Sequence, residues 1–431
     1  MNQEIAACTA LLAVLSQAAH DPEFIAQHRT RDTAFTRERQ LTFPRLIALM
    51  LRGMTQSIQG ELDAFFAALI GKDSWHRVVT KSAFSQARQK LSPTALSALN
   101  TLWTQANEQA CAATRWCGLR VVASDSSTLR LPPWRENQEA FGQHCGATMA
   151  RATGLLAVAS GQMLVARLDP CACDERSALV PLLGSLSEHD MLVLDRGYPA
   201  RWMFALLAVV GIPFCIRVDA CGWADVKRFV RAGKLDAIVE LPLCARDRAN
   251  VARQGMCLLS SVRTVRVRLV RVILPNGRIE VLITSAYDPK QYPASAFGAL
   301  YHSRWRIEEC FKTLKHRLHL EAFSGELPHA ITQDFHAKIL LANIAHALCH
   351  AAHALLAEDQ QDTWRVNHTH ALRALKHVLG NWLCCGICSV AVHDIILLLN
   401  QTLEWYRPDR SCPRKHAVGG ARKPRRAYKT A

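Results

Sequence analysis

The chain has 431 residues, enough to bury a large core and to form roughly two to four domains or subdomains. Its 52 lysine and arginine residues exceed its 36 aspartate and glutamate residues, and the net charge of +16 at pH 7 predicts a polyanionic partner, with nucleic acid the leading candidate. The apolar run from Met203 to Ile216 is too short to span a membrane and contains Pro213, so we expect a soluble protein.

The first residues and the cysteines both favour a cytoplasmic protein. The start, MNQEIAACTALLAVL, has an acidic residue and no lysine or arginine before its apolar residues, unlike a signal peptide. The 16 cysteines are scattered, and the single CxxC motif, Cys385 and Cys388, has no second pair at the spacing of a zinc site. We therefore expect small buried side chains in a reducing cytoplasm.

Residues 1–115 are predicted to be helical, with apolar residues three and four positions apart in Phe43–Phe66. The segment Ser82–Pro93 fits a helix that Ser82 caps and that ends before Pro93. Basic residues flank these short helices: Arg37, Arg39, Arg45, Arg52, Arg88 and Lys90. A helix-turn-helix DNA reader and a helical bundle that only packs or dimerises are equally open readings of this region.

From about Gly118 the apolar pattern changes to period two, which is typical of strands. We expect a strand through Asp125, two strands joined by a turn at Ser160 and Gly161, and then helices alternating with further strands. The expected ranges after the first strand are strands 153–159 and 163–168, helix 175–186, strand 191–195, helix 201–210 and strand 212–218. This order predicts an α/β ribonuclease-H-like mixed sheet.

Two aspartates occupy positions in this sheet where a carboxylate is costly. Asp125 lies within the first strand, and Asp195 ends a buried one. If these strands are neighbours, both carboxylates meet at one edge, and Glu308 on a later helix can complete a three-carboxylate cage suited to two Mg²⁺ ions about 3.5 to 4 Å apart. Either aspartate alone could instead be a turn-capping residue.

Residues 220–285 contain alternating segments rich in arginine, and we expect a β-rich insertion. One face is predicted to cover the sheet and the other to hold DNA phosphates, although charge that protects an edge strand is the alternative. The arginines in question are Arg263, Arg266, Arg268 and Arg271.

The segment Tyr301–Leu320 separates polar from apolar residues at helical period and predicts one amphipathic helix. The inward arc consists of Ile307, Phe311, Leu314 and Leu318, and the polar arc of Tyr301, Arg304, Glu308, Lys312 and Lys315. A solvated face with helical ion pairs is the alternative reading of the polar arc. Further helices are expected at 336–356 and 368–405, before a basic tail that either binds DNA or aids solubility.

Tyr301, Arg304, Glu308 and Lys315 are separated by two, three and six residues. This is the Tyr-Arg-Glu-Lys signature of DDE-type transposases of the insertion sequence 4 family, which the chain resembles from about residue 35 to about 325. Asp125 in ASDSSTLRLP and Asp195 in DRGY are similar to the family's two aspartate motifs. The insertion also resembles the family's, but where some relatives have a base-clamping tryptophan this chain has the sequence Ile-Glu-Val, and Trp223 is only a remote substitute.

The resemblance implies a transposase that binds the ends of an insertion sequence and catalyses metal-dependent DNA cleavage and strand transfer. It implies two Mg²⁺ ions, for which Mn²⁺ can substitute, on Asp125, Asp195 and Glu308. Tyr301, Arg304, Lys312, Lys315 and Arg196 are the expected contacts to double-stranded DNA, both element ends and target. A homodimer in a paired-end complex is also implied. The alternatives are a ribonuclease-H-like nuclease without strand transfer and an inactive, transposase-derived DNA-binding regulator.

These expectations divide the chain into five regions. They are a helical DNA-binding region at 1–115, the first part of the catalytic core at 116–219, the β-rich insertion at 220–285, the second part of the core with the signature helix at 286–350, and a helical C-terminal region with the basic tail at 351–431.

Overall fold

The computed structural model describes residues 3–406 apart from 38, 55–56, 72–76, 111–113, 254, 256–258 and 260. The basic tail therefore lies outside the described residues. The chain divides into two compact units. The sheet unit takes residues 111–128 and 150–312, and the helical unit takes residues 1–110, 129–149 and 313–431.

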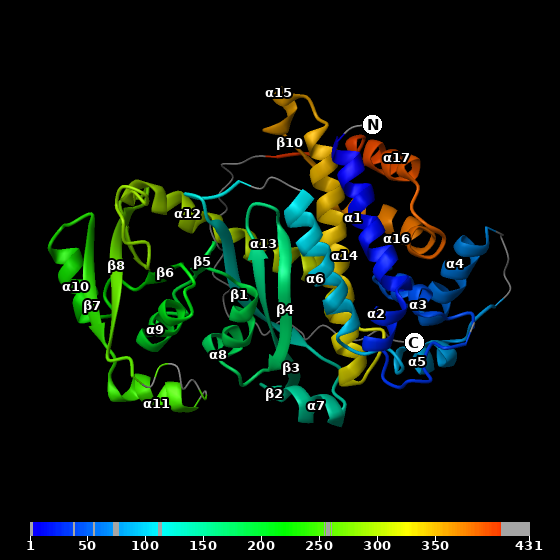
Figure 1. Cartoon of the computed structure of the whole chain (residues 1–431), viewed down its shortest axis with the longest axis horizontal. Helices are drawn as coiled ribbons and strands as arrows, with labels where there is room; N and C mark the ends of the chain where they lie inside the picture. The colour runs from blue at the N-terminus through cyan, green and yellow to red at the C-terminus, as the bar shows by residue number, and fades with distance from the viewer. Residues whose placement is uncertain are drawn as a thin grey trace. The chain divides into compact units, whose positions relative to one another are not determined.

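A mixed sheet of nine strands, counted over the described residues, organises the sheet unit (Figure 1). Its order is β2-β3-β1-β5-β6-β9-β8-β7, and β4 pairs with β3. The strands are β1 Arg120–Arg130, β2 Gln143–His144, β3 Ala147–Ala157, β4 Gln162–Pro170, β5 Asp190–Leu194, β6 Phe214–Val218, β7 Asp236–Pro242, β8 Thr264–Ile273 and β9 Ile279–Thr284. The central strands β1, β5 and β6 are parallel, whereas β3 with β4 and the β6-β9-β8-β7 series are antiparallel.

This connectivity confirms the predicted ribonuclease-H-like mixed sheet. Three long strands, β1, β3 and β4, come first, with the two-residue β2 between β1 and β3. Strand β3 is antiparallel to β1, because Val158 N donates to Val121 O at one end and Leu131 N donates to Thr148 O at the other. Helical crossovers then add β5 and β6 parallel to β1. Every residue of β5 is buried, as expected for a central parallel strand covered on both faces.

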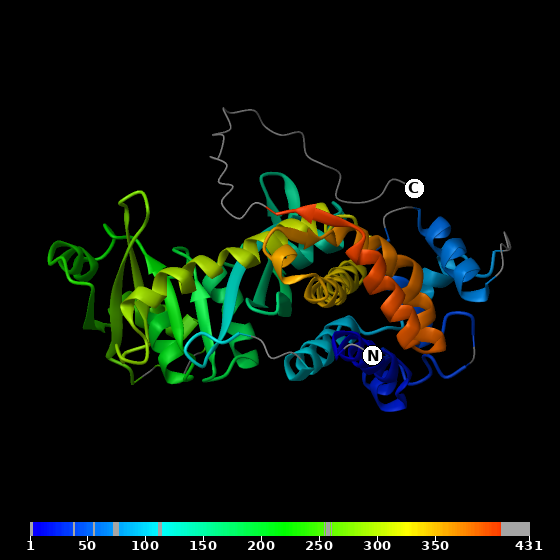
Figure 2. The same cartoon turned by 90° about the horizontal axis from the view of Figure 1, so that it is seen from above.

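Helices cover both faces of this sheet. Figures 1 and 2 place α8 and α9 on one side and α12 and α13 on the other. The predicted helix 175–186 is α-helical only over α8, because Pro181 follows and residues Val180–Ser185 form a 3₁₀ helix instead. The helices of this unit are α8 Glu175–Leu179, α9 Arg201–Val209, α10 Ala224–Arg231, α11 Ala245–Arg253, α12 Phe297–Ser303 and α13 Trp305–His316, the last of which continues beyond the unit boundary.

The insertion extends the sheet, so the expectation that it covers a face was wrong. Strand β9 pairs antiparallel with β6, and β8 and β7 follow outward in the same sheet. Its segments α10 and α11 are helical rather than extended. The sequence pattern could not distinguish these arrangements, because a strand that joins an edge and a strand that packs on a face both alternate with period two.

The single helix predicted over Tyr301–Leu320 is interrupted and shorter. Arg304 lies between α12 and α13, where its N–H bonds to Tyr301 O at 3.2 Å in an i to i−3 pattern. The chain leaves the helix after His316, and His319 adopts a φ of 48°. The predicted inward residues Ile307, Phe311, Leu314 and Leu318 are nevertheless all buried.

The helical unit combines the first and last parts of the chain around one long helix, α14. This helix of 27 residues has buried side chains on most of its surface and packs against α1, α6, α16 and α17. The elements of this unit are α1 Gln3–His20, α2 Pro22–Gln27, α3 Phe43–Met50, α4 Ile58–Ile70, α5 Lys81–Arg88, α6 Ala95–Ala110, α7 Arg135–Phe141, α14 Pro328–Ala354, α15 Glu358–Gln361, α16 His368–Cys385, α17 Ser389–Asn400, and the paired strands β10 Trp364–Val366 and β11 Leu403–Trp405.

Two boundaries in this unit differ from expectation. Thr80, and not Ser82, caps α5, because the Thr80 hydroxyl accepts the Ala83 N–H at 3.2 Å. The helix predicted to 405 is two helices and a strand, since Gly386 has a φ of 101° at the end of α16. Within the described ranges, no helix combines the length and apolar character that crossing a membrane requires.

Candidate active site

The sheet brings Asp125 and Asp195 to the same edge. Strands β1 and β5 pair in parallel up to Ala123 and Val193, and each aspartate lies two residues beyond that last pair. The Asp125 carboxylate accepts the Ser126 N–H at 2.8 Å, and the Asp195 carboxylate accepts the Gly197 N–H at 2.7 Å. The predicted meeting of the two aspartates is thus a consequence of strand pairing.

Glu308 comes to this region from the first turn of α13. This turn is held at the end of β3, because Arg306 Nη1 donates a hydrogen bond to Val158 O at 2.6 Å. Glu308 Oε1 accepts a hydrogen bond from Arg304 Nη2 at 2.6 Å. Arg304 is only 5% exposed, and its guanidinium lies 5.8 Å from the centre of the Tyr301 ring. Arg304 is therefore buried and Glu308, whose side chain is 22% exposed, is half-buried, so the alternative of a fully solvated helix face does not describe this pair.

The three acids influence one another electrostatically. Burial raises the pKa of Asp125 to about 6, against the lowering effects of the Ser126 N–H and the Arg304 guanidinium, while the carboxylates of Asp195 and Glu308 raise it further. Repulsion among carboxylates in a partly dry site is the condition that a divalent cation relieves. The donor chemistry therefore fits Mg²⁺, which prefers carboxylate oxygens.

The three carboxylates do not form a ready-made set of ligands. Across the part of the chain that the structure describes, no group of three or more His, Cys, Asp or Glu side chains is arranged to hold a metal ion. One of the two Glu308 oxygens, Oε1, is engaged by Arg304 through a hydrogen bond.

The burial of Asp125 predicts a pH-dependent stability. The pKa is about 6 in the folded chain and about 3.9 in an unfolded one, so the folded state holds the proton more tightly. The stability that protonated Asp125 contributes is complete below about pH 4 and is lost as the pH rises through about 6. Two pKa units correspond to about 3 kcal/mol.

We therefore expect Asp125→Asn to exceed the wild type in unfolding free energy at pH 8 by up to about 3 kcal/mol and to differ much less at pH 4. Urea denaturation in the presence of EDTA measures both values. A stability difference that does not change between pH 4 and pH 8 would contradict the assignment of a raised pKa to Asp125.

The predicted DNA-contact residues lie in different environments. Arg196, beside Asp195, and Lys312 are exposed, and the Lys312 ammonium lies 6.0 Å from the centre of the exposed Trp305 ring. Tyr301 and Arg304 are buried. Lys315 is half-buried in the helical unit, where burial lowers its pKa and the Glu321 carboxylate opposes that effect.

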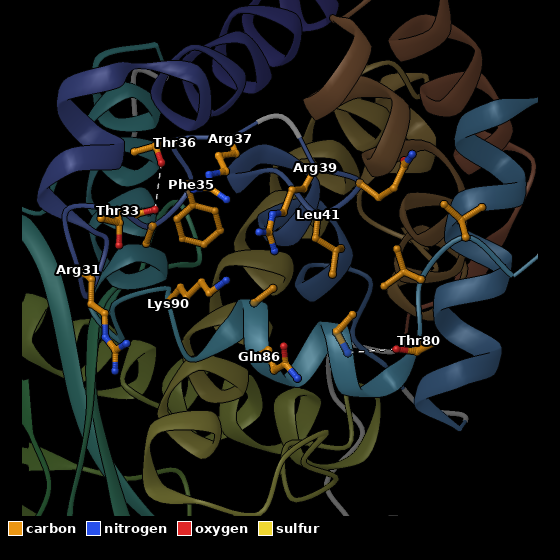
Figure 3. Close-up of a pocket in the computed structure, with 16 residues that line it drawn as sticks. Arg31, Thr33, Phe35, Thr36, Arg37, Arg39, Leu41, Thr80, Gln86 and Lys90 are labelled. Carbon is orange, nitrogen blue, oxygen red and sulfur yellow. Dashed lines mark hydrogen bonds between the residues drawn. The ribbon is translucent and has the colours of Figure 1, made fainter.

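A basic hollow of about 640 Å³ lies in the helical unit between the loop before α3 and helix α5. The side chains of Phe35, Arg37, Arg39 and Lys90 point into it (Figure 3). Arg37 and Arg39 were among the cations that the sequence associated with DNA, and both are exposed. The hollow thus presents several positive charges together with the hydroxyls of threonines.

Three other predicted cations have structural partners instead. Arg88 is 4% exposed and pairs with Asp334, and Arg52 is 5% exposed and lies 4.0 Å from Glu61. In the insertion, Arg268 is 1% exposed and binds Asp236 together with two backbone carbonyls. For Arg52 and Arg88 the structure therefore favours the packing role that the sequence left open, and the expectation that Arg268 lies on a phosphate-binding face was wrong, because its guanidinium is held inside the protein.

Sequence reasoning missed Glu175, which begins α8. Its Oε1 lies 3.3 Å from Arg151 Nη1. A Cβ atom added to Gly197 would meet Glu175 Oε2 at 2.7 Å and Asp195 Oδ1 at 3.0 Å, so this carboxylate shares the space around Asp195. The only sequence signal was an acidic residue in the first turn of a helix, which usually reports helix-dipole stabilisation.

Residues 116–344, more than half of the chain, match the family model described as the transposase DDE domain. The chain belongs to the DDE transposase family. This family segment contains Asp125, Asp195 and Glu308 and confirms the resemblance inferred from the motifs. Trp223, the remote base-clamp candidate, packs against Phe204 in the sheet unit, with the two ring centres 5.7 Å apart.

Two individual proteins are similar to this DDE family member. Transposase InsG for insertion sequence element IS4 of Escherichia coli strain K12 is 23% identical over 274 residues, which cover 62% of this chain and 60% of that protein. The chain thus matches less than two thirds of this relative's length. The cryo-EM structure of piggyBac transposase in a synaptic complex with hairpin DNA has a TM-score of 0.46 and 8% identity, covering 90% of this chain and 85% of that one.

Proposed function

We propose that this chain binds the ends of an insertion sequence and catalyses metal-dependent DNA strand cleavage and strand transfer. The observation that carries the proposal is the position of Asp125 and Asp195 at equal distances beyond the paired strands β1 and β5, with Glu308 close enough to raise the pKa of Asp125. Membership of the DDE transposase family and the net charge of +16 support a DNA substrate.

Asp125, Asp195 and Glu308 are the residues that would hold two Mg²⁺ ions, with Mn²⁺ able to replace them. Such ions supply a lowered pKa for a water or 3′-hydroxyl nucleophile and charge stabilisation for the leaving oxygen. Strand pairing fixes the two aspartates, and we expect Glu308, whose Oε1 is bound to Arg304, to exchange that partner for the cation. That exchange would also release the Arg304 guanidinium to donate hydrogen bonds to a phosphate.

The remaining cations are proposed to position the DNA. Arg196 and Lys312 are exposed and can approach phosphates directly, and Lys315 and Tyr301 would contact the strand end as the signature motif implies. The partners that follow are double-stranded DNA, both element ends and target, and a second copy of the chain in a paired-end complex. A cytoplasmic location with access to DNA is part of the same proposal.

The decisive experiment incubates the full chain with DNA that carries the flanking element ends, with and without Mg²⁺. Cleavage at the ends only with Mg²⁺, followed by joining of pre-cut ends to target DNA, supports the proposal. Cleavage without joining would instead indicate a ribonuclease-H-like nuclease. Binding without either reaction would indicate an inactive DNA-binding regulator.

The basic hollow gives a prediction for end binding. Arg39→Ala should weaken binding, because one phosphate contact is lost. The fall of log K with log salt should become shallower by nearly one unit. Its effect on the unfolding free energy should stay within about 0.5 kcal/mol, since the side chain is exposed. Fluorescence anisotropy over a salt series provides the measurement.

Arg135→Ala is a matched control for Arg39→Ala. It removes the same charge from an exposed arginine that lies outside the hollow and pairs with Glu139 at 2.7 Å. Equal changes in slope for the two variants would show that the hollow has no special part in DNA binding.

A further inference from the structure

Glu175 is held beside Asp195 by contacts from two arginines. Arg151 donates from Nε to Cys173 O at 2.6 Å, just before α8, and from Nη1 to Glu175 Oε1 at 3.3 Å. Arg176, the next residue of α8, donates to Tyr198 O at 3.1 Å. The start of α8 is thereby tied both to β3 and to the turn that follows Asp195.

The two oxygens of Glu175 have different surroundings. Oε1 accepts from Arg151, while Oε2 lies with Asp195 Oδ1 around the space that a side chain on Gly197 would occupy. Because both oxygens approach the same point, at 2.7 Å and 3.0 Å, their separation cannot exceed the sum of these distances. Glycine at 197 is what allows two carboxylates to approach there.

Both carboxylates carry negative charge, and one oxygen of each lies around the same small space beside Gly197. Bringing two carboxylates together is unfavourable unless a proton or a cation lies between them.

Tyr198 supplies an independent observation from the same region. It is fully buried in the neighbourhood of the Glu175 and Asp125 carboxylates. The hydroxyl lies beside Ser124 and Ser126, yet in the described part of the chain it has no hydrogen-bond partner of normal geometry. A buried hydroxyl near these carboxylates that lacks a partner of normal geometry calls for a further polar group beside it.

We propose that Glu175 is a fourth carboxylate of the divalent-ion site and binds the same cation as Asp195, an inference that rests on the proposed function. The cation would be a hard ion of the Mg²⁺ or Mn²⁺ class, which commonly uses one or two carboxylates and completes its shell with water or substrate phosphate. Arg151 then acts on the outer oxygen of a ligand, as groups behind metal ligands do.

The test measures Mn²⁺ affinity of the full chain in the absence of DNA by titration calorimetry. Glu175→Gln should weaken Mn²⁺ binding by about 10- to 100-fold. Asp169→Asn is the control, because this carboxylate is also buried and also near Arg151 but has Arg167 at 2.7 Å as its partner. It should change the affinity by less than about twofold. Wild-type affinity in Glu175→Gln would overturn the proposal.

Asp125→Asn separates this inference from the proposed function. If it retains the Mn²⁺ affinity of the wild type, the proposed metal site itself fails. If Asp125→Asn loses affinity and Glu175→Gln does not, only the role of Glu175 is rejected.

Glu175→Gln could weaken Mn²⁺ binding only because it destabilises the fold, which a lower melting temperature without metal would reveal. In that case Arg151→Met is the second variant, because it breaks the Arg151–Glu175 ion pair but keeps the Glu175 and Asp195 carboxylates. An Mn²⁺ affinity equal to or higher than that of the wild type supports the proposal, since a positive charge near the cation has gone. A fall as large as that of Glu175→Gln means that the ion pair alone matters and overturns it.

Discussion

Replacing Asp125 or Asp195 by Asn, or Glu308 by Gln, is expected to reduce Mg²⁺-dependent cleavage of element-end DNA by a factor on the order of 1000 or more. An amide retains the shape of the carboxylate but not its charge, so it cannot bind a divalent cation with comparable strength. End binding should persist, since the cations proposed to contact the DNA remain unchanged in these variants. Cleavage of labelled ends and gel-shift titration on each variant provide the two measurements.

The three variants should differ in binding even though all lose cleavage. Glu308→Gln removes the charge that Arg304 pairs with at 2.6 Å, so the guanidinium becomes available to phosphate and DNA binding should tighten. Asp125→Asn, on strand β1, leaves that pair intact. Glu309→Gln is the control, since its exposed side chain follows Glu308 on α13 and removes the same charge.

The outcomes are separable. Cleavage retained by any one of the three acid variants removes that residue from the metal site. If Glu308→Gln and Glu309→Gln tighten binding equally, the gain reflects net charge alone and Arg304 is not released to the DNA.

The sheet and its two aspartates were predictable because their signals are local. Alternation around Asp125 and the apolar run before Asp195 define two strands without reference to the rest of the chain. Their neighbourhood required only the usual order of strands in such a mixed sheet. The burial of Ile307 and Phe311 likewise follows from helical period.

The surroundings of these residues were not predictable in the same way. Helical period placed Tyr301 and Arg304 on a polar arc, but the sheet unit buries them, with Arg217 lying 5.8 Å from the Tyr301 ring. Glu175 acquires its place only because the turn after β5 passes Gly197 close to α8. Such contacts join segments distant in sequence, and periodicity contains no information about them.

The sequence shows that Arg88 and Lys90 are both basic, but it does not show that only one of them faces the basic hollow. Lys90, two residues later, lines the basic hollow, whereas Arg88 turns inward from the end of α5. Its guanidinium donates to Ser324 Oγ, Ala330 O and Asp334 Oδ1, each at 2.9 Å, and to Gln333 Oε1 at 3.1 Å. This network joins α5 to the first turns of α14 within the helical unit.

Arg88→Met should therefore destabilise the fold by about 3 to 5 kcal/mol, because it leaves the buried Asp334 carboxylate without its cation. Lys90→Met, which removes the same charge from the hollow, should change the unfolding free energy by less than about 0.5 kcal/mol and weaken DNA binding instead. Adding Asp334→Leu to Arg88→Met should recover much of the loss, since no unpaired charge then remains buried. Urea denaturation of the four proteins, wild type included, measures these differences. Equal stability of the two single variants would show that Arg88 is a surface cation after all and would restore it to the candidates for DNA binding.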